Sequence, residues 1–451
     1  MRGADILVSG GTVVTPDSVF KADVLVTGGR VAKVGRNLMA GGASVLDATG
    51  LFVLPGAIDG HVHMRDPGLT EKEDFSSGTA AAAAGGVTTV LEMPNTLPPV
   101  ESVQRLLEKK EVLSPKAIVD FGLYAVLYDG NASRVVGMAM AGAVGFKAFM
   151  GPTTGNIPPP SDASIFESLS ALKALGVPTA FHAENQSMIT YYTNKVKATG
   201  RMDPKAHCDA RPPICETEAV NRVCFLASKS GGKAHFVHIS TGEAMRLVEE
   251  HRARGAAVTC ETNPQYLSMT EEDMARLGGL GKINPPLRTE ADQNALWDGV
   301  ANGAVECIGS DHAPHLVSEK LGTNIWDVPS GFIGVETLLP IMLDFVSRGK
   351  TSLQRVVTLL SRNPARLYGI AERKGEIKEG ADGDLAIVDL TQERIIRAEL
   401  LHSKQKVTPF EGRKVRATII HTIVRGNVVY DGEVLAPAGE WVKPRWADSA
   451  A

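Results

Sequence analysis

Residues 55–68 read Pro-Gly-Ala-Ile-Asp-Gly-His-Val-His-Met-Arg-Asp-Pro-Gly, and the apolar run from Leu51 to Leu54 leads into them. The run predicts a short buried strand that the following Pro-Gly pair ends. On an extended backbone, side chains two positions apart share a face, so His61 and His63 would project together from a strand end. Two convergent imidazoles suit a borderline-soft divalent ion such as zinc, although this pair alone is a weak signal.

From about Leu54 onward, short apolar runs typical of strands alternate with runs typical of helices. Eight such units over roughly 300 residues predict an α/β fold, a parallel (β/α)8 TIM-like barrel. An open, doubly wound sheet is the alternative, but the sequence contains no GxGxxG turn and no P-loop. The predicted strands are residues 51–58, 87–92, 118–126, 145–150, 177–182, 234–238, 257–261 and 305–310.

The two ends of the chain have a different sequence pattern, in which short β segments are separated by glycine-rich turns. This pattern is typical of an all-β unit. We therefore expect both ends to form one small β-sandwich domain, split across the termini. The expected division is residues 1–54 for its first part, 55–372 for the barrel and 373–451 for its second part. The proline-rich segment 152–160 is interpreted as a loop over the barrel mouth.

Length and composition limit the class of protein. With 451 residues the chain exceeds the usual single core, and its net charge of −4 gives no electrostatic reason to expect nucleic acid or an anionic membrane as a partner. No apolar run approaches the ~20 residues of a membrane span, and the first residues lack the apolar segment of a signal peptide. The five cysteines form an odd set without CxxC spacing, which argues against a disulfide framework. We therefore expect a cytoplasmic protein of enzyme size.

Polar side chains recur at the carboxyl ends of the predicted strands, where barrel enzymes carry their catalytic groups. Besides the two histidines of the first strand, these are Lys147, His182, His238 and Asp311. Each alone has an ordinary interpretation, such as a hydrogen-bonded core histidine, a salt-bridging lysine or a loop-capping aspartate. Six such groups at one end of successive strands are hard to explain in that way. Together they predict a metal site.

Four histidines and one carboxylate satisfy two divalent ions only if a further group bridges the ions. A protonated lysine amine cannot do so. Carboxylated by carbon dioxide, Lys147 would become an anionic carbamate able to contact both ions, and this is the interpretation we favour.

The set resembles the amidohydrolase superfamily, and within it dihydroorotase of the larger bacterial type, over essentially the whole chain. The Gly-Phe-Lys-Ala-Phe context of Lys147 is similar to the carbamylated members, hydantoinases and allantoinases. The resemblance implies two divalent metal ions, most simply zinc. It places His61, His63 and Asp311 on one ion and His182 and His238 on the other, with N6-carboxylated Lys147 as the bridge.

The resemblance also implies a set of substrate-binding residues. Arg65 supplies a planar fork suited to a ring carboxylate. Asn95 in Met-Pro-Asn-Thr and His315 in Asp-His-Ala-Pro-His match the other carboxylate anchors of dihydroorotase, and the Asn284-Pro-Pro context is similar as well. Residues 260–267, Cys-Glu-Thr-Asn-Pro-Gln-Tyr-Leu, depart from this pattern and resemble hydantoinase and allantoinase instead.

The implied activity is the reversible interconversion of dihydroorotate and N-carbamoyl-L-aspartate in pyrimidine biosynthesis. Metal coordination lowers the pKa of water, and Asp311 would carry the proton from the attacking water to the departing ring nitrogen. Allantoinase and dihydropyrimidinase or hydantoinase are the alternative activities. A more distant alternative is a non-catalytic barrel that serves as an assembly subunit beside a transcarbamoylase. The resemblance also implies a homodimer or homotetramer.

Overall fold

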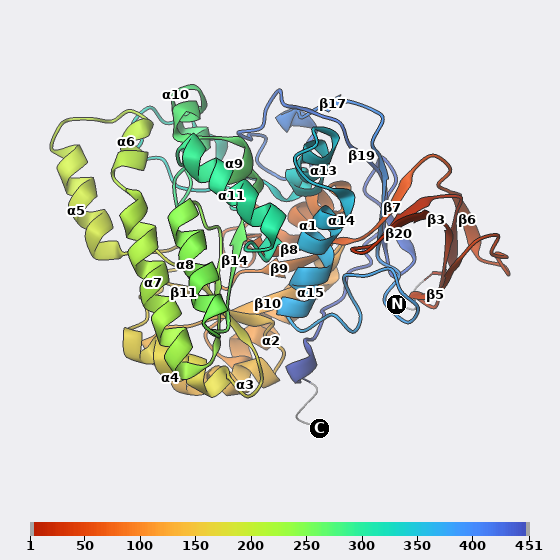
Figure 1. Ribbon diagram of the computed structural model, residues 1–451, viewed down its shortest axis with the longest axis horizontal. Coiled ribbons are helices and arrows are strands. Elements are labelled where there is room, and N and C mark those ends of the chain that lie inside the picture. Colours follow the sequence, from red (N-terminus) through yellow and green to blue (C-terminus); the bar gives the residue numbers. More distant parts are fainter. Residues whose placement is uncertain (1–3, 448–451) are drawn as a thin grey trace.

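The computed structural model describes residues 4–447, and its larger part is a parallel barrel (Figure 1). The barrel sheet has the order β15-β14-β13-β12-β11-β10-β9-β8, so strands adjacent in sequence are also adjacent in space. A bridge between Val62 and His312 brings the two edges together. The strands are β8 (Ala57–Val62), β9 (Val87–Glu92), β10 (Asp120–Val126), β11 (Gly145–Phe149), β12 (Pro178–His182), β13 (Lys233–Phe236), β14 (Val258–Thr262) and β15 (Cys307–Ile308).

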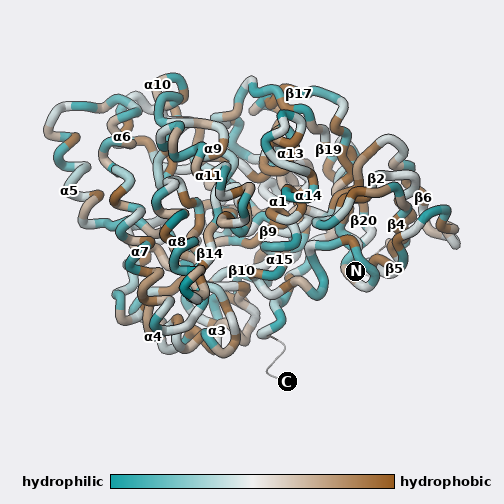
Figure 2. Tube along the Cα trace, in the orientation of Figure 1, coloured by the Kyte–Doolittle hydropathy of each residue, from teal (hydrophilic) through white to brown (hydrophobic). Residues whose placement is uncertain are grey.

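Helices surround these strands, and the strands are almost wholly buried between them and the barrel interior. Along the outer helices the trace changes repeatedly between hydrophobic and hydrophilic residues, as burial of one face requires (Figure 2). None of the helices within residues 4–447 is long and apolar enough to cross a membrane. The principal helices are α1 (Phe75–Ala84), α2 (Val103–Leu113), α3 (Val135–Met140), α4 (Asp162–Leu172), α5 (Gln186–Lys197), α6 (Lys205–Asp209), α7 (Pro213–Ser230), α8 (Gly242–Ala253), α11 (Glu290–Asn302), α13 (Leu338–Ser347) and α15 (Asn363–Leu367).

Two further sheets pack together beside the barrel, at the right of Figure 1. Their orders are β5-β4-β1-β6 and β20-β19-β16-β7-β2-β3, so the second sheet combines strands from both ends of the chain. The predicted α/β barrel with a small β unit from both chain ends is therefore confirmed. The strands are β1 (Ile6–Ser9), β2 (Thr12–Val14), β3 (Val19–Lys21), β4 (Asp23–Thr27), β5 (Arg30–Gly35), β6 (Ser44–Asp47), β7 (Phe52–Pro55), β16 (Leu385–Asp389), β19 (Thr418–Val424) and β20 (Asn427–Tyr430).

The predicted first barrel strand, residues 51–58, is wrong in one respect. The structure divides this run into β7, which pairs with β16 in the sandwich, and β8, which pairs with β9 in the barrel. The chain changes sheets at Gly56, whose N–H donates to the carbonyl of Asp384. A Cβ at this position would lie 2.1 Å from the hydroxyl oxygen of Thr88, so only glycine fits the crossing.

A buried cluster of charges lies at the opposite end of the barrel from the carboxyl ends of the strands. Lys374 contacts the carboxylate of Asp120, the first residue of β10, and lies 2.8 Å from Asp382 and 2.6 Å from Asp384. Arg425 also pairs with Asp120. These contacts join the barrel to the segment that enters the sandwich.

Candidate metal centre

A cavity of about 320 Å³ opens at the carboxyl ends of the barrel strands. Its wall includes residues from the first, fourth, fifth, sixth and eighth barrel strands or the loops after them. All ten residues that the sequence singled out as site residues line it: His61, His63, Arg65, Asn95, Lys147, His182, His238, Asn284, Asp311 and His315. The structure thus brings together the whole predicted set, and Thr153 and Thr154 of the 152–160 loop border the same cavity.

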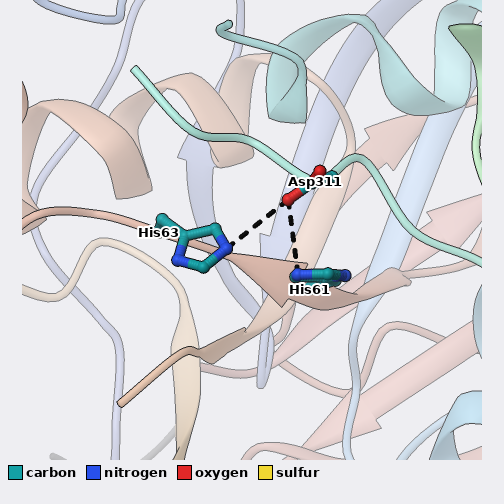
Figure 3. Close-up of side chains that lie close together, drawn as sticks. All are labelled: His61, His63 and Asp311. Atoms are coloured by element: carbon teal, nitrogen blue, oxygen red, sulfur yellow. Dashed lines mark ion pairs between the residues drawn. The ribbon is translucent and has the colours of Figure 1, made fainter. Parts of the chain in front are cut away.

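His61, His63 and Asp311 form one convergent group (Figure 3). His61 lies in β8, His63 follows its end, and Asp311 comes from the loop after β15. Oδ1 of Asp311 lies 3.3 Å from Nε2 of His61 and 3.4 Å from Nε2 of His63. Both histidines therefore present the same ring nitrogen to one carboxylate oxygen, an arrangement that a single cation could occupy.

The second pair lies next to this group. Nδ1 of His182, at the end of β12, is 3.0 Å from Nε2 of His238, which follows β13. The rings of His61 and His238 are 5.3 Å apart between centroids. Nζ of Lys147, in β11, is 3.4 Å from Nε2 of His61, so the lysine lies at the boundary between the two groups.

The protonation states of these residues suit a divalent ion. Burial lowers the pKa of His63 to about 4 and holds the pKa values of His61 and His238 well below their usual range, so the imidazoles are neutral and have lone pairs to share. Burial also lowers the pKa of Lys147. The donor set therefore consists of neutral imidazoles, a carboxylate and a lysine that loses its proton more readily than usual. Such a set fits divalent metals of the zinc type.

Three of the four histidines are oriented through their other ring nitrogen. Nδ1 of His61 lies 3.1 Å from Oε1 of Glu261, Nδ1 of His63 lies 2.8 Å from Oδ1 of Asn95, and Nε2 of His182 lies 2.9 Å from Oε2 of Glu184. Such partners fix the tautomer and the ring orientation of a metal-binding histidine. Two of these partners, Glu261 and Glu184, were not predicted from the sequence. The available signal was a carboxylate at or just beyond the end of a barrel strand that itself carries or adjoins a site histidine.

Arg65 forms one side of the cavity and is 4% exposed. Its Nε–H donates to the carbonyl of Pro314 at 3.1 Å. Its Nη2 lies 3.4 Å from Nε2 of His315. That nitrogen of His315 also faces the carbonyl oxygen of Ser330 at 3.0 Å, while Lys72 donates to Nδ1 at 3.1 Å. We infer that Nε2 of His315 carries the proton, so it offers Arg65 no lone pair.

Asn95 and Asn284 contribute amide groups to the wall. Besides its contact with His63, Asn95 donates from Nδ2 to the hydroxyl of Thr153 at 3.3 Å. Oδ1 of Asn284 is buried without a hydrogen-bond partner within the described part of the chain. A buried acceptor of this kind is costly unless a ligand or water donates to it.

Residues 52–429 match the sequence model of the amidohydrolase family. The chain belongs to this family. It is 40% identical over 450 residues to an allantoinase of Rubrobacter xylanophilus, with 99% of each chain covered. It is 36% identical over 436 residues to a dihydroorotase of Methanosarcina mazei, with 94% of each covered. Among solved structures, the L-hydantoinase (dihydropyrimidinase) from Arthrobacter aurescens superposes with a TM-score of 0.94 at 35% identity, covering 98% of this chain and 100% of that one.

These amidohydrolases carry three different activity names, so the expected likeness to dihydroorotase holds for one group of relatives among several. The match confirms the predicted amidohydrolase family, and the structure contains a candidate metal-binding group within its barrel. The choice of substrate depends on the residues around the cavity.

Proposed function

We propose that this amidohydrolase opens and closes cyclic amide rings that carry a carboxylate, with dihydroorotate and N-carbamoyl-L-aspartate as its substrate pair. The observation that carries the proposal is Arg65, a buried cation on the wall of the metal-binding cavity. This position makes a ring carboxylate the natural partner, because a planar guanidinium binds carboxylates through paired, charge-assisted hydrogen bonds.

Arg65 lacks such a partner within residues 4–447. None of their carboxylate oxygens forms an ion pair with its guanidinium within 4 Å. Burial lowers the pKa of Arg65 to about 10, which still leaves it charged at neutral pH. The carboxylates of Glu92, Asp311 and Glu319 stabilise this charge from beyond ion-pair distance, and an anionic substrate would give the guanidinium a direct partner. Lys72, beside His315, is already paired with Glu319 at 3.0 Å, which leaves Arg65 as the cation available to a substrate on this side of the cavity.

We propose that His61, His63 and Asp311 would hold one divalent ion and that His182 and His238 would hold a second, with Lys147 between them as a carbamate. The low pKa of the buried lysine supports this role, because only the neutral amine combines with carbon dioxide. When bound, the ions would polarise the amide carbonyl and lower the pKa of the attacking water.

Side chains of the protein would carry out proton transfer and substrate binding. Asp311, whose Oδ1 faces both His61 and His63, is placed to accept the proton of the attacking water and to deliver it to the ring nitrogen as the amide bond breaks. Oδ1 of Asn284, which has no hydrogen-bond partner in the described part of the chain, would accept from a ring N–H. Arg65 and Nδ2 of Asn95 would hold the ring carboxylate.

Hydrolysis of an uncharged ring, such as allantoin, is the second candidate. Two observations favour it: the 40% identity to the Rubrobacter allantoinase, and the likeness of residues 260–267 to hydantoinases and allantoinases. Neither observation accounts for a buried arginine in the cavity that forms no direct ion pair within residues 4–447, and for that reason we rank this activity second.

A substrate panel tests the proposal. The zinc-supplemented protein would be assayed for ring opening of L-dihydroorotate, allantoin and dihydrouracil. We expect a clear preference for dihydroorotate. Arg65→Met should raise KM for dihydroorotate about 100-fold, the loss of a charge-assisted bidentate contact, with little change for an uncharged ring. The matched control is Arg254→Met, an exposed arginine of the surface pair with Glu250. Preference for allantoin, or equal effects of Arg65→Met on charged and uncharged rings, would contradict the proposal.

A further inference from the structure

Glu261 lies in β14, directly below the cavity, and its carboxylate is fully buried. It does not line the cavity and has no part in the proposed chemistry. Its hydrogen bonds reach His61 of β8 and His238, which follows β13, and these two histidines fall in the two different ligand groups.

The first contact is with the side chain of His61. Oε1 of Glu261 lies 3.1 Å from Nδ1 of that ring. An ionised carboxylate can only accept, so it places the proton on Nδ1 and leaves the lone pair of Nε2 facing Asp311 and Lys147.

The second contact is with the backbone of His238. Its N–H donates to the same oxygen of Glu261 in a long hydrogen bond of 3.4 Å. His238 has a φ of +44°, a left-handed conformation that a residue with a Cβ rarely adopts. Contacts from the surroundings must hold such a residue in place, and Glu261 supplies one of them.

The space for this carboxylate depends on a glycine. A Cβ added at Gly309, just beyond β15, would lie 2.7 Å from the carboxyl carbon of Glu261 and 2.8 Å from each of its oxygens. These distances are too short for real contacts, so any side chain at position 309 would displace the carboxylate. Gly309 therefore offers a way to move Glu261 without changing its chemistry.

We propose that Glu261 is a positioning residue shared by both metal sites: it orients the ring of a ligand of one ion and the backbone of a ligand of the other. The second carboxyl oxygen, Oε2, forms no hydrogen bond within the described residues and lies 3.9 Å from Nε2 of the buried His235, so both oxygens of Glu261 face histidines. The inference rests on the metal-binding half of the proposed function and is independent of the identity of the substrate.

The test measures metal binding without substrate. Zinc dissociation constants of both sites would be determined by competition with a chelator, and the absorption spectrum of the cobalt-substituted protein would report ligand geometry. We expect Glu261→Leu to weaken zinc binding about 100-fold, in the range found for partners of metal-binding histidines. Glu261→Gln should lose tenfold or less, because its amide oxygen can still accept from His61. Gly309→Ala should fall between the two and alter the cobalt spectrum.

Gly137→Ala is the matched control for Gly309→Ala, because a Cβ at Gly137 in α3 meets nothing within 4 Å. Variants that unfold more easily but bind zinc as the wild type does, with an unchanged cobalt spectrum, would overturn the inference. If Glu261→Leu does not fold, Glu261→Gln and Gly309→Ala decide the question. A wild-type protein that binds no zinc would overturn the proposed metal centre and this inference together. Zinc binding without ring opening would contradict the proposed activity alone.

Discussion

Oδ1 of Asn95 lies 2.8 Å from Nδ1 of His63, so a residue expected to bind substrate also orients a metal-binding histidine. The remaining part of its amide, Nδ2, points to Thr153 in the loop at the barrel mouth. One side chain thus connects the metal centre with the substrate side of the cavity. Substitution of Asn95 should therefore affect two measurable properties at once.

Asn95→Ala should weaken zinc binding about tenfold and also raise KM for dihydroorotate, because the alanine removes both the acceptor for His63 and the donor for the ring carboxylate. Chelator competition and steady-state kinetics measure the two effects separately. Thr153→Val is the control, since it removes only the 3.3 Å partner of Nδ2. An Asn95→Ala protein with wild-type zinc affinity would show that His63 does not depend on this contact.

Asp311→Asn should bind zinc yet lose turnover by about a thousandfold or more, because the carboxamide cannot accept the proton of the attacking water. Metal content by atomic absorption and ring-opening rates check the two parts of the prediction. Asp298→Asn, at an exposed position of α11, should behave as the wild type. Retention of most activity in Asp311→Asn would exclude the assigned proton-transfer role.

His207 predicts a pH dependence of stability. Nε2 of this buried residue of α6 lies 2.8 Å from the carbonyl oxygen of Ile283, next to Asn284, and burial lowers the pKa of His207 to about 3. An unfolded histidine titrates near 6.5. Between these values the unfolded chain binds a proton that the folded protein does not, so the contribution to stability is complete above pH 6.5 and declines as the pH falls toward 3.

His207→Gln should flatten this decline, because glutamine can still donate to Ile283 and does not titrate. Between pH 7.5 and pH 5 the free energy of unfolding of the wild type should fall by about 2 kcal/mol more than that of His207→Gln. The figure follows because pH 5 lies roughly 1.5 units below the pKa of an unfolded histidine. Urea unfolding of both metal-free proteins at the two pH values measures it. Parallel stability curves would contradict the prediction.

Lys374→Met should lower the free energy of unfolding by about 3–5 kcal/mol, because the carboxylates of Asp120, Asp382 and Asp384 would lose a buried counter-ion. Zinc affinity should not change, since the cluster lies at the far end of the barrel from the cavity. Lys378→Met, which removes an exposed pair with Glu376, should cost less than about 1 kcal/mol. Denaturant titration compares the two variants. Equal effects would mean that the buried cluster contributes no more than a surface pair.

The site was predictable because its signals are local. An extended backbone places His61 and His63 on one face, and parallel strands in sequential order carry the following polar residues to the same end of the barrel. Glu261 carries a similar signal, because it ends the predicted strand 257–261, but its partners could not be predicted. They are His61 of β8 and His238 after β13, and only the folded barrel brings the side chain of Glu261 to both.

The prediction of the first barrel strand was wrong for a related reason. Pro55 and Gly56 interrupt residues 51–58 and mark the end of a strand, but nothing in the sequence shows that the residues on either side belong to different sheets. The change is imposed by pairing of β7 with β16, a strand from the other end of the chain. Long-range pairing of this kind leaves no periodic signal in either partner.

This pairing also bears on how the protein is made. β7 and β2 leave the ribosome before the barrel, whereas their sheet is incomplete until β16 and β19 have followed it. At ordinary rates of translation this interval is on the order of a minute, and for its duration β7 has an open edge that could pair with other nascent chains. The sandwich is therefore begun first and completed last, and a molecular chaperone that shields strand edges would protect it during this interval.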